Sequence, residues 1–151
     1  MKFAKIAVVM YPSKDIHDEF GFPYDLKLDF DLEDPIRYYT SAGGIFYILL
    51  NGGDVVGTVA IKKLDERVAE LKRMYLLPKY RGHGWGAKLL EHALAFCRDK
   101  GFESCVLDTN VKQESAQRLY ASYGFETYKQ EKNNLELTHL HKSVPSGTLF
   151  R

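Results

Sequence analysis

The stretch that decides the fold runs from Leu77 to Leu94 and reads LPKYRGHGWGAKLLEHAL. It places three glycines within five residues, directly before an apolar run with helical spacing. Leu90, Ala93, Leu94 and Cys97 recur at i, i+3, i+4 and i+7, which predicts a helix after the glycines. So many glycines give the backbone more freedom than a simple turn requires. The loop is therefore predicted to approach a ligand closely.

Two kinds of nucleotide-binding loop share features with this stretch. Gly82, Gly84 and Ala87 satisfy a dinucleotide-binding fingerprint, but the strand expected before them carries charges. A parallel strand buried on both faces would be continuously apolar, so the sequence disfavours this interpretation. A magnesium-dependent phosphate loop fails as well, because Leu89 stands where that loop needs a hydroxyl side chain.

A third interpretation fits the spacing of Arg81, Gly84 and Gly86 ahead of a helix that begins near Trp85. Glycines at these positions let the backbone come close to a phosphate. Their N–H groups and the positive end of the helix then face a pyrophosphate. A glycine-rich turn with no ligand would show the same residues, so the surrounding sequence has to decide.

The rest of the chain predicts one mixed α+β domain over residues 1–151, with a loosely held tail after about residue 143. Residues 13–40 are expected to hold one or two short helices and a loop. A helix is expected after the glycines, and a second around residues 116–123. The expected strands cover residues 3–10, 44–50, 55–64, 68–77, 104–109, 125–129 and 135–142.

Composition narrows the classes of function. The 21 basic and 20 acidic residues nearly cancel, so nothing points to nucleic acid or an anionic membrane. Cys97 and Cys105 are the only cysteines, which fits a reducing compartment and no disulfide framework. No apolar run is long enough to span a bilayer. We therefore expect a cytoplasmic protein without nucleic-acid or membrane partners.

Three pieces in succession resemble the acyl-CoA-binding core of the GNAT superfamily of N-acetyltransferases, and its small bacterial members most. They read LKRMYLLPKYRGHGWGAKLL, VLDT and ESAQRLYASYGFE, within a region from about Val68 to Glu126. The resemblance implies a mixed, mostly antiparallel sheet of about seven strands flanked by helices. It also implies that the fourth and fifth strands, Val68–Leu76 and Ser104–Asp108, splay apart.

Acetyl-CoA as cosubstrate, with no metal, follows from the same resemblance. Backbone groups of Met74, Tyr75 and Leu76 would pair with the pantetheine arm, and an N–H near Leu76 would polarise the acetyl carbonyl. Gln113 stands where the family often has an asparagine that contacts the cofactor or the substrate. We expect Gln113 to belong to the cofactor site, but its different side chain leaves the usual asparagine contact open. The residues implied around the pyrophosphate are Arg81, Gly82, His83, Gly84, Trp85, Gly86 and Ala87.

Aminolysis of a thioester requires a neutral amine, and a nearby carboxylate can take the proton. Glu70 and Asp108 are the candidates on the two strands beside the expected cleft, although each could be a structural strand charge. The resemblance implies Tyr120 as the general acid for the departing thiolate. Its position on an apolar helix stripe is also typical of core packing. Whether Glu70, Asp108 or water is the base stays open.

The expected function is acetyl transfer from acetyl-CoA to a primary amine of a small molecule or peptide, by direct attack in a ternary complex. A non-catalytic CoA-binding regulatory module of the same fold is the alternative, and a nucleotide-dependent oxidoreductase is a third possibility. His139 and His141 share a strand face without a third ligand, so they are expected to be surface histidines. The acceptor, the acyl group and the oligomeric state, a homodimer included, stay open.

Overall fold

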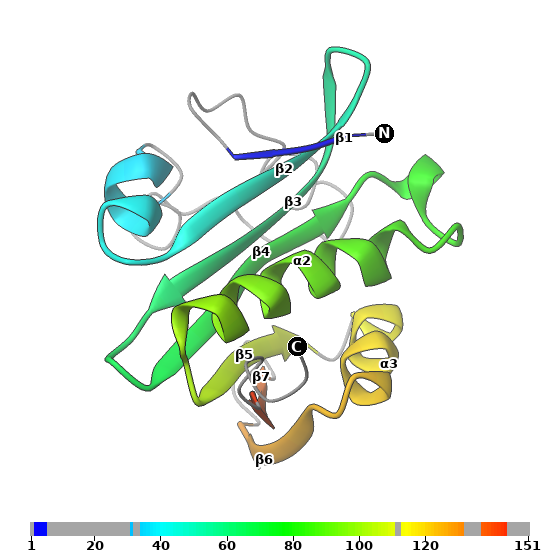
Figure 1. The fold of residues 1–151 in the computed structure, drawn as a ribbon. Coiled ribbons are helices and arrows are strands. Elements are labelled where there is room, and N and C mark those ends of the chain that lie inside the picture. The colour runs from blue at the N-terminus through cyan, green and yellow to red at the C-terminus, as the bar shows by residue number, and fades with distance from the viewer. Residues whose placement is uncertain (1, 6–30, 32–33, 111–112, 132–136, 145–151) are drawn as a thin grey trace, which may run out of the picture.

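The computed structural model describes residues 2–5, 31, 34–110, 113–131 and 137–144. They form a mixed α+β fold in which seven strands make one sheet, in the order β1-β2-β3-β4-β5-β7-β6. Neighbouring strands are antiparallel except β4 and β5, which run parallel. Helix α2 lies across one face of this sheet, and helix α3 lies near β5 (Figure 1).

The elements follow the predicted order. The strands are β1 (Lys2–Lys5), β2 (Ile45–Asn51), β3 (Asp54–Lys63), β4 (Val68–Leu76), β5 (Ser104–Asn110), β6 (Glu126–Gln130) and β7 (Leu137–Ser143). The helices are α2 (Trp85–Lys100) and α3 (Glu114–Ser122), with short helical turns η2 (Ile36–Thr40) and η3 (Pro78–Tyr80). The first strand is described only as far as residue 5, and most of residues 13–40 lie outside the described residues.

The core lies between α2 and the sheet. Leu90, Ala93, Leu94 and Cys97 are buried, as their spacing predicted, and Leu89 is buried with them. This stripe packs against β2, β3, β4 and β5. Because each fully buried leucine contributes about 1.5–3 kcal/mol, the stripe holds the helix and its N-terminus in a fixed place on the sheet.

The pairing of β4 changes along its length. Its parallel ladder with β5 covers only Val68–Glu70 against Ser104–Val106, whereas β5 pairs with β7 along its whole length. Within the described register, the C-terminal half of β4 is therefore paired with β3 alone. There the register shifts as well, because two residues of β4 oppose a single residue of β3. This two-to-one match is a β-bulge, which bends the strand locally.

Candidate active site

The glycine loop joins β4 to the N-terminus of α2. Gly82 and Gly84 have φ angles of 81° and 87°, in the left-handed region that glycine adopts without steric cost. Apart from the two chain neighbours, no atom of the described residues lies within 4 Å of a Cβ built at either position. The chain therefore needs glycine at both positions for its backbone conformation and not for lack of space among the described residues.

Gly86 is glycine for a different reason. It lies in the first turn of α2, and its φ is not positive. A Cβ there would meet a methyl carbon of Leu119 at 3.5 Å, an ordinary contact. The absence of a side chain at Gly86 therefore keeps the gap between α2 and α3 open at this point.

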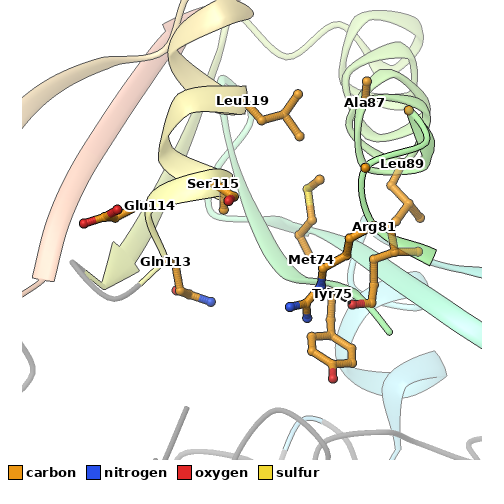
Figure 2. Close-up of a pocket in the computed structure, with 14 residues that line it drawn as sticks. Met74, Tyr75, Arg81, Ala87, Leu89, Gln113, Glu114, Ser115 and Leu119 are labelled. Carbon is orange, nitrogen blue, oxygen red and sulfur yellow. Dashed lines mark hydrogen bonds between the residues drawn. The ribbon is translucent and has the colours of Figure 1, made fainter. Parts of the chain in front are cut away.

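A cleft of about 600 Å³ lies between β4, the loop, α2 and α3. Figure 2 shows Gln113, at the N-cap of α3, and Leu119 of α3 on the opposite side of the cleft from Arg81, Ala87 and Leu89. The lining residues are Met74, Tyr75, Leu76, Arg81, Gly82, Gly84, Gly86, Ala87, Leu89, Gln113, Glu114, Ser115, Ala116 and Leu119. All the residues predicted to contact a cofactor are present except His83 and Trp85.

The side chains of those two residues lie elsewhere. His83 is exposed, and Trp85 is half-buried with its ring centroid 6.4 Å from that of Phe3. Trp85 therefore packs against the core and the first strand. Neither residue lines the cleft.

Two polar side chains of the lining are fixed by the backbone around them. The Nε of Arg81 donates to the carbonyl oxygen of Leu76 at 2.8 Å, which ties the loop to the end of β4. The Oε1 of Gln113 accepts from the N–H of Asn110 and the hydroxyl of Thr109, each at 3.3 Å. The amide nitrogen of Gln113 points into the cleft as a donor (Figure 2).

The first turns of α3 form a wall of the cleft that the sequence analysis did not predict. Glu114, Ser115, Ala116 and Leu119 all line it. They belong to the quoted piece ESAQRLYASYGFE, but no contact to a ligand was assigned to their side chains. The signal that could have found them is their position at the start of the helix that directly follows β5.

Glu70 lies on β4 just before the bulge and outside the cleft lining. It is half-buried, and it sits opposite Lys62 of β3 and Val106 of β5 in the sheet. Burial raises the pKa of Glu70 above its ordinary value; the charge of Lys72 opposes this rise, and that of Asp108 adds to it. Within the described part of the chain, the side chain of Glu70 forms no ion pair or hydrogen bond.

Asp108 and His139 form a pair across β5 and β7. The Nδ1 of His139 donates to the carboxylate of Asp108, and its Nε2 lies 3.5 Å from Oε2 of Glu131. The side chain of His139 is only 15% exposed, so the expectation of a surface histidine was wrong for this residue. Strand pairing with Asp108 draws His139 inward, while His141 is exposed as expected.

Tyr120 belongs to the hydrophobic core. It is 5% exposed and packs edge-on against Phe125, with ring centroids 5.8 Å apart. Burial raises the pKa of Tyr120, and the neighbouring Cys105 raises it further. Its side chain is not part of the cleft lining. The structure therefore brings most of the residues predicted to bind a cofactor together in one cleft, and it places all three predicted catalytic residues outside the cleft lining.

The described residues contain neither a metal-binding cluster nor a membrane-spanning helix. No group of three or more His, Cys, Asp or Glu side chains in these ranges could hold a metal ion. No helix that the structure describes has the length and apolar character to cross a membrane.

The fold and the cleft together define a class of protein, one with a mixed sheet and with a cleft lined by the end of β4, a glycine loop and the N-terminus of a helix. Comparison with known proteins identifies the family. The family model for acetyltransferases of the GNAT family matches residues 13–125. The chain belongs to this family.

Its relatives are N-acetyltransferases by name. It is 31% identical over 119 residues to the uncharacterized N-acetyltransferase YjgM of Escherichia coli, covering 75% of this chain and 71% of that protein. It is 36% identical over 104 residues to a probable N-acetyltransferase, family 8 member 5, of Mus musculus. That match covers 66% of this chain and 46% of the mouse protein, so the chain spans about half of that relative.

Solved structures share the fold. An acetyltransferase from Streptococcus agalactiae matches with a TM-score of 0.83 and 24% identity, over 95% of this chain and 98% of that one. A second match, at a TM-score of 0.70 and 16% identity, is yncA from Salmonella typhimurium in a structure with its cofactor acetyl-CoA. It covers 98% of this chain and 96% of that one.

Proposed function

We propose that this protein transfers an acetyl group from acetyl-CoA to a primary amine of a small molecule or peptide, by direct attack in a ternary complex. The observation that carries the proposal is the cleft. It brings the backbone of β4, the glycine loop and the N-terminus of α2 together along one surface. We propose that residues 1–151 form one such domain, acting in the cytoplasm.

The cleft suits the two parts of a CoA molecule that enzymes recognise through the backbone. The N–H groups from Gly82 to Ala87 and the positive end of α2 take the pyrophosphate. The backbone of Met74–Leu76 pairs with the pantetheine arm, which enters where the ladder between β4 and β5 ends at Glu70. The acetyl-CoA present in the structure of yncA, which shares the fold, supports this choice of cosubstrate.

The acceptor amine reaches the thioester from the side of Glu70. As the new C–N bond forms and the C–S bond breaks, the amine gives up a proton. A carboxylate with a raised pKa accepts that proton more readily than an ordinary one, and Glu70 has both the raised pKa and no competing ion pair among the described residues. Asp108 contributes by keeping the pKa of Glu70 high.

The departing thiolate takes its proton from Tyr120. The hydroxyl of Tyr120 is protonated at neutral pH, as a general acid must be, and burial raises its pKa further, which makes it a weaker acid towards the thiolate. Tyr120 lies in the core, outside the cleft lining, and the substitution Tyr120→Phe tests its role directly. The alternative proton source is water.

The experiment that tests the function measures free CoA released from acetyl-CoA with a panel of amines. The panel contains small amines, polyamines, amino acids and peptide N-termini, with a no-amine control that reports hydrolysis. Release that depends on an amine supports the proposal and identifies the acceptor class. Tight CoA binding without release on any amine would instead support the alternative, a non-catalytic CoA-binding regulatory module.

A further inference from the structure

A buried polar network lies beside the bulge of β4. It joins Arg73 of β4 to Asp31 and Tyr39, two residues that precede β2 in the chain. Asp31 is 1% exposed and accepts two hydrogen bonds from Arg73, from Nε at 2.9 Å and from Nη2 at 2.5 Å. The hydroxyl of Tyr39, which is fully buried, donates to the same carboxylate. The backbone oxygen of Arg73 accepts from the hydroxyl of Thr58 at 2.6 Å. Side chain and main chain of Arg73 are therefore both held.

Arg73 has an unusual backbone conformation. Its φ is 53°, which makes it the one residue other than glycine with a positive φ among the described ranges. The left-handed region is sterically unfavourable for a residue with a Cβ, so a non-glycine residue stays there only when its surroundings hold it. The network supplies that restraint, because it fixes the guanidinium at one end of the residue and the carbonyl at the other.

Stability alone is a poor explanation for this arrangement. A buried ion pair recovers little more than the cost of removing its charges from water, and apolar residues often replace one without loss. Burial acts to raise the pKa of Asp31, but the hydrogen bonds from Arg73 and Tyr39 and the charge of Arg73 hold it below its ordinary value. The carboxylate is thus charged at neutral pH and stays paired with the guanidinium of Arg73.

The position of the network suggests its purpose. Met74, the next residue along the strand, is the first residue of β4 that lines the cleft, and Tyr75 and Leu76 follow it. Glu70 lies three residues before Arg73 on the same strand. The strained residue thus separates the segment that lines the cleft from the candidate base.

We propose that Asp31, Arg73 and Tyr39 form a positioning clamp, which sets the β4 bulge so that the backbone of Met74–Leu76 meets the acetyl end of the bound thioester. The clamp rests on the proposed function for its use in acetyl transfer. Its three side chains act through the bulge, so they are positioning residues and not catalytic ones. If the clamp has this role, loosening it disturbs binding at the acetyl end of the thioester more than at the pyrophosphate end, because the glycine loop holds the pyrophosphate end separately.

The first test needs no ligand. Amide hydrogen exchange across β4 is measured in the free protein for the wild type, Asp31→Asn and Tyr39→Phe. The control is Leu140→Ala, a buried core change in β7 that is separated from β4 by β5. We expect exchange at Arg73–Leu76 to become at least tenfold faster in the clamp variants and not in the control. Unchanged exchange in a folded Asp31→Asn or Tyr39→Phe variant would overturn the clamp.

The second test separates positioning from stability by kinetics. With acetyl-CoA and an accepted amine, Tyr39→Phe and Asp31→Asn should lower kcat about tenfold or more, while the dissociation constant of CoA changes less than threefold. Leu140→Ala should leave both unchanged at temperatures where it is folded. Equal losses of CoA affinity and kcat would overturn a role at the acetyl end, as would normal kcat in both clamp variants.

Arg73 itself provides a rescue comparison. Arg73→Ala removes the side chain and leaves a residue that resists positive φ, whereas Arg73→Gly removes the same side chain but adopts that conformation freely. The glycine variant should therefore keep several-fold more kcat than the alanine variant; equal kcat in the two variants would contradict the clamp. If the wild type acetylates no amine, the proposed function fails, while hydrogen exchange still decides whether the clamp exists.

Discussion

The two halves of the candidate site are built in different ways. The cofactor half consists of backbone, held by Gly82, Gly84, the start of α2 and the end of β4, and it forms a continuous cleft. The catalytic half consists of single side chains, Glu70, Asp108 and Tyr120, none of which lines that cleft. A backbone site depends on local conformation, whereas side-chain chemistry depends on how distant elements meet. The first half can therefore be tested by changing backbone freedom, and the second by removing one functional group at a time.

The largest effect is expected from Gly84→Val. Valine resists positive φ at a cost of about 1–2 kcal/mol, and it withdraws backbone N–H groups from the phosphates. Losing one or two charge-assisted hydrogen bonds adds about 1.5–3 kcal/mol each. We expect the dissociation constant of CoA, measured by calorimetry, to rise about 1000-fold, equivalent to about 4 kcal/mol.

A matched control exists in the hairpin between β2 and β3. Gly52 has a φ of 63° and, like Gly84, no atom within 4 Å of an added Cβ. Gly52→Val should therefore lower the free energy of unfolding about as much as Gly84→Val does, and it should leave the affinity for CoA unchanged. If the two valine variants bind CoA equally well, the glycines of the loop serve only its turn, and the cofactor half of the account is wrong.

The next effect is on the catalytic half. Glu70→Gln keeps the size of the side chain but cannot accept a proton, so we expect kcat to fall about 10²- to 10³-fold with little change in CoA affinity. Glu126→Gln, which changes an exposed carboxylate on β6, is the control and should behave as the wild type. Wild-type turnover in Glu70→Gln would transfer the role of base to Asp108 or to water.

Tyr120→Phe distinguishes catalysis from packing. The ring and its contact with Phe125 remain, so the melting temperature should change little. If the hydroxyl protonates the thiolate, kcat should fall about 100-fold, the low end of general-acid effects, because a thiolate also leaves readily unaided. The loss should shrink as pH rises towards the pKa of the thiol. A variant with wild-type turnover across that range would make Tyr120 a core residue only.

The smallest effects are shifts in the pH dependence of turnover. A general base works when deprotonated, so the rate should rise with pH through the pKa of Glu70. The charge of Lys72 lowers this pKa and that of Asp108 raises it. Lys72→Met should therefore move the acidic limb of kcat to higher pH, and Asp108→Asn should move it to lower pH. Shifts in the same direction, or none, would show that Glu70 does not control the limb.

The same division explains what the sequence could predict. The order of elements and the α2 stripe follow from local signals, namely apolar spacing, glycine positions and strand length. Most of the cleft lining was predicted from the resemblance. The mixed, mostly antiparallel sheet flanked by helices agrees with what the resemblance implied, whereas the parallel pairing of β4 with β5 was not predicted. Its splay between those strands stays part of the proposal, supported by a ladder that ends at Glu70.

The hydrogen bonds between side chains could not be predicted from the sequence, because they join residues far apart in the chain. Asp31 and Arg73 are separated by 42 positions, and His139 and Asp108 by 31. Nothing in the local pattern around Arg73 indicates a positive φ, since bulges arise from mismatched register between two strands. Only the assembled sheet reveals that His139 turns inward and that Arg73 is held from two sides.

The most direct test of the central claim is the melting temperature of the wild-type protein with acetyl-CoA, NAD or ATP. At about a hundred times its dissociation constant, a ligand adds about 2.7 kcal/mol to stability. For a domain of this size, that raises the melting temperature by about 5–10 °C. The account predicts this rise with acetyl-CoA and none with NAD or ATP. No rise with acetyl-CoA, or a larger one with NAD, would contradict it.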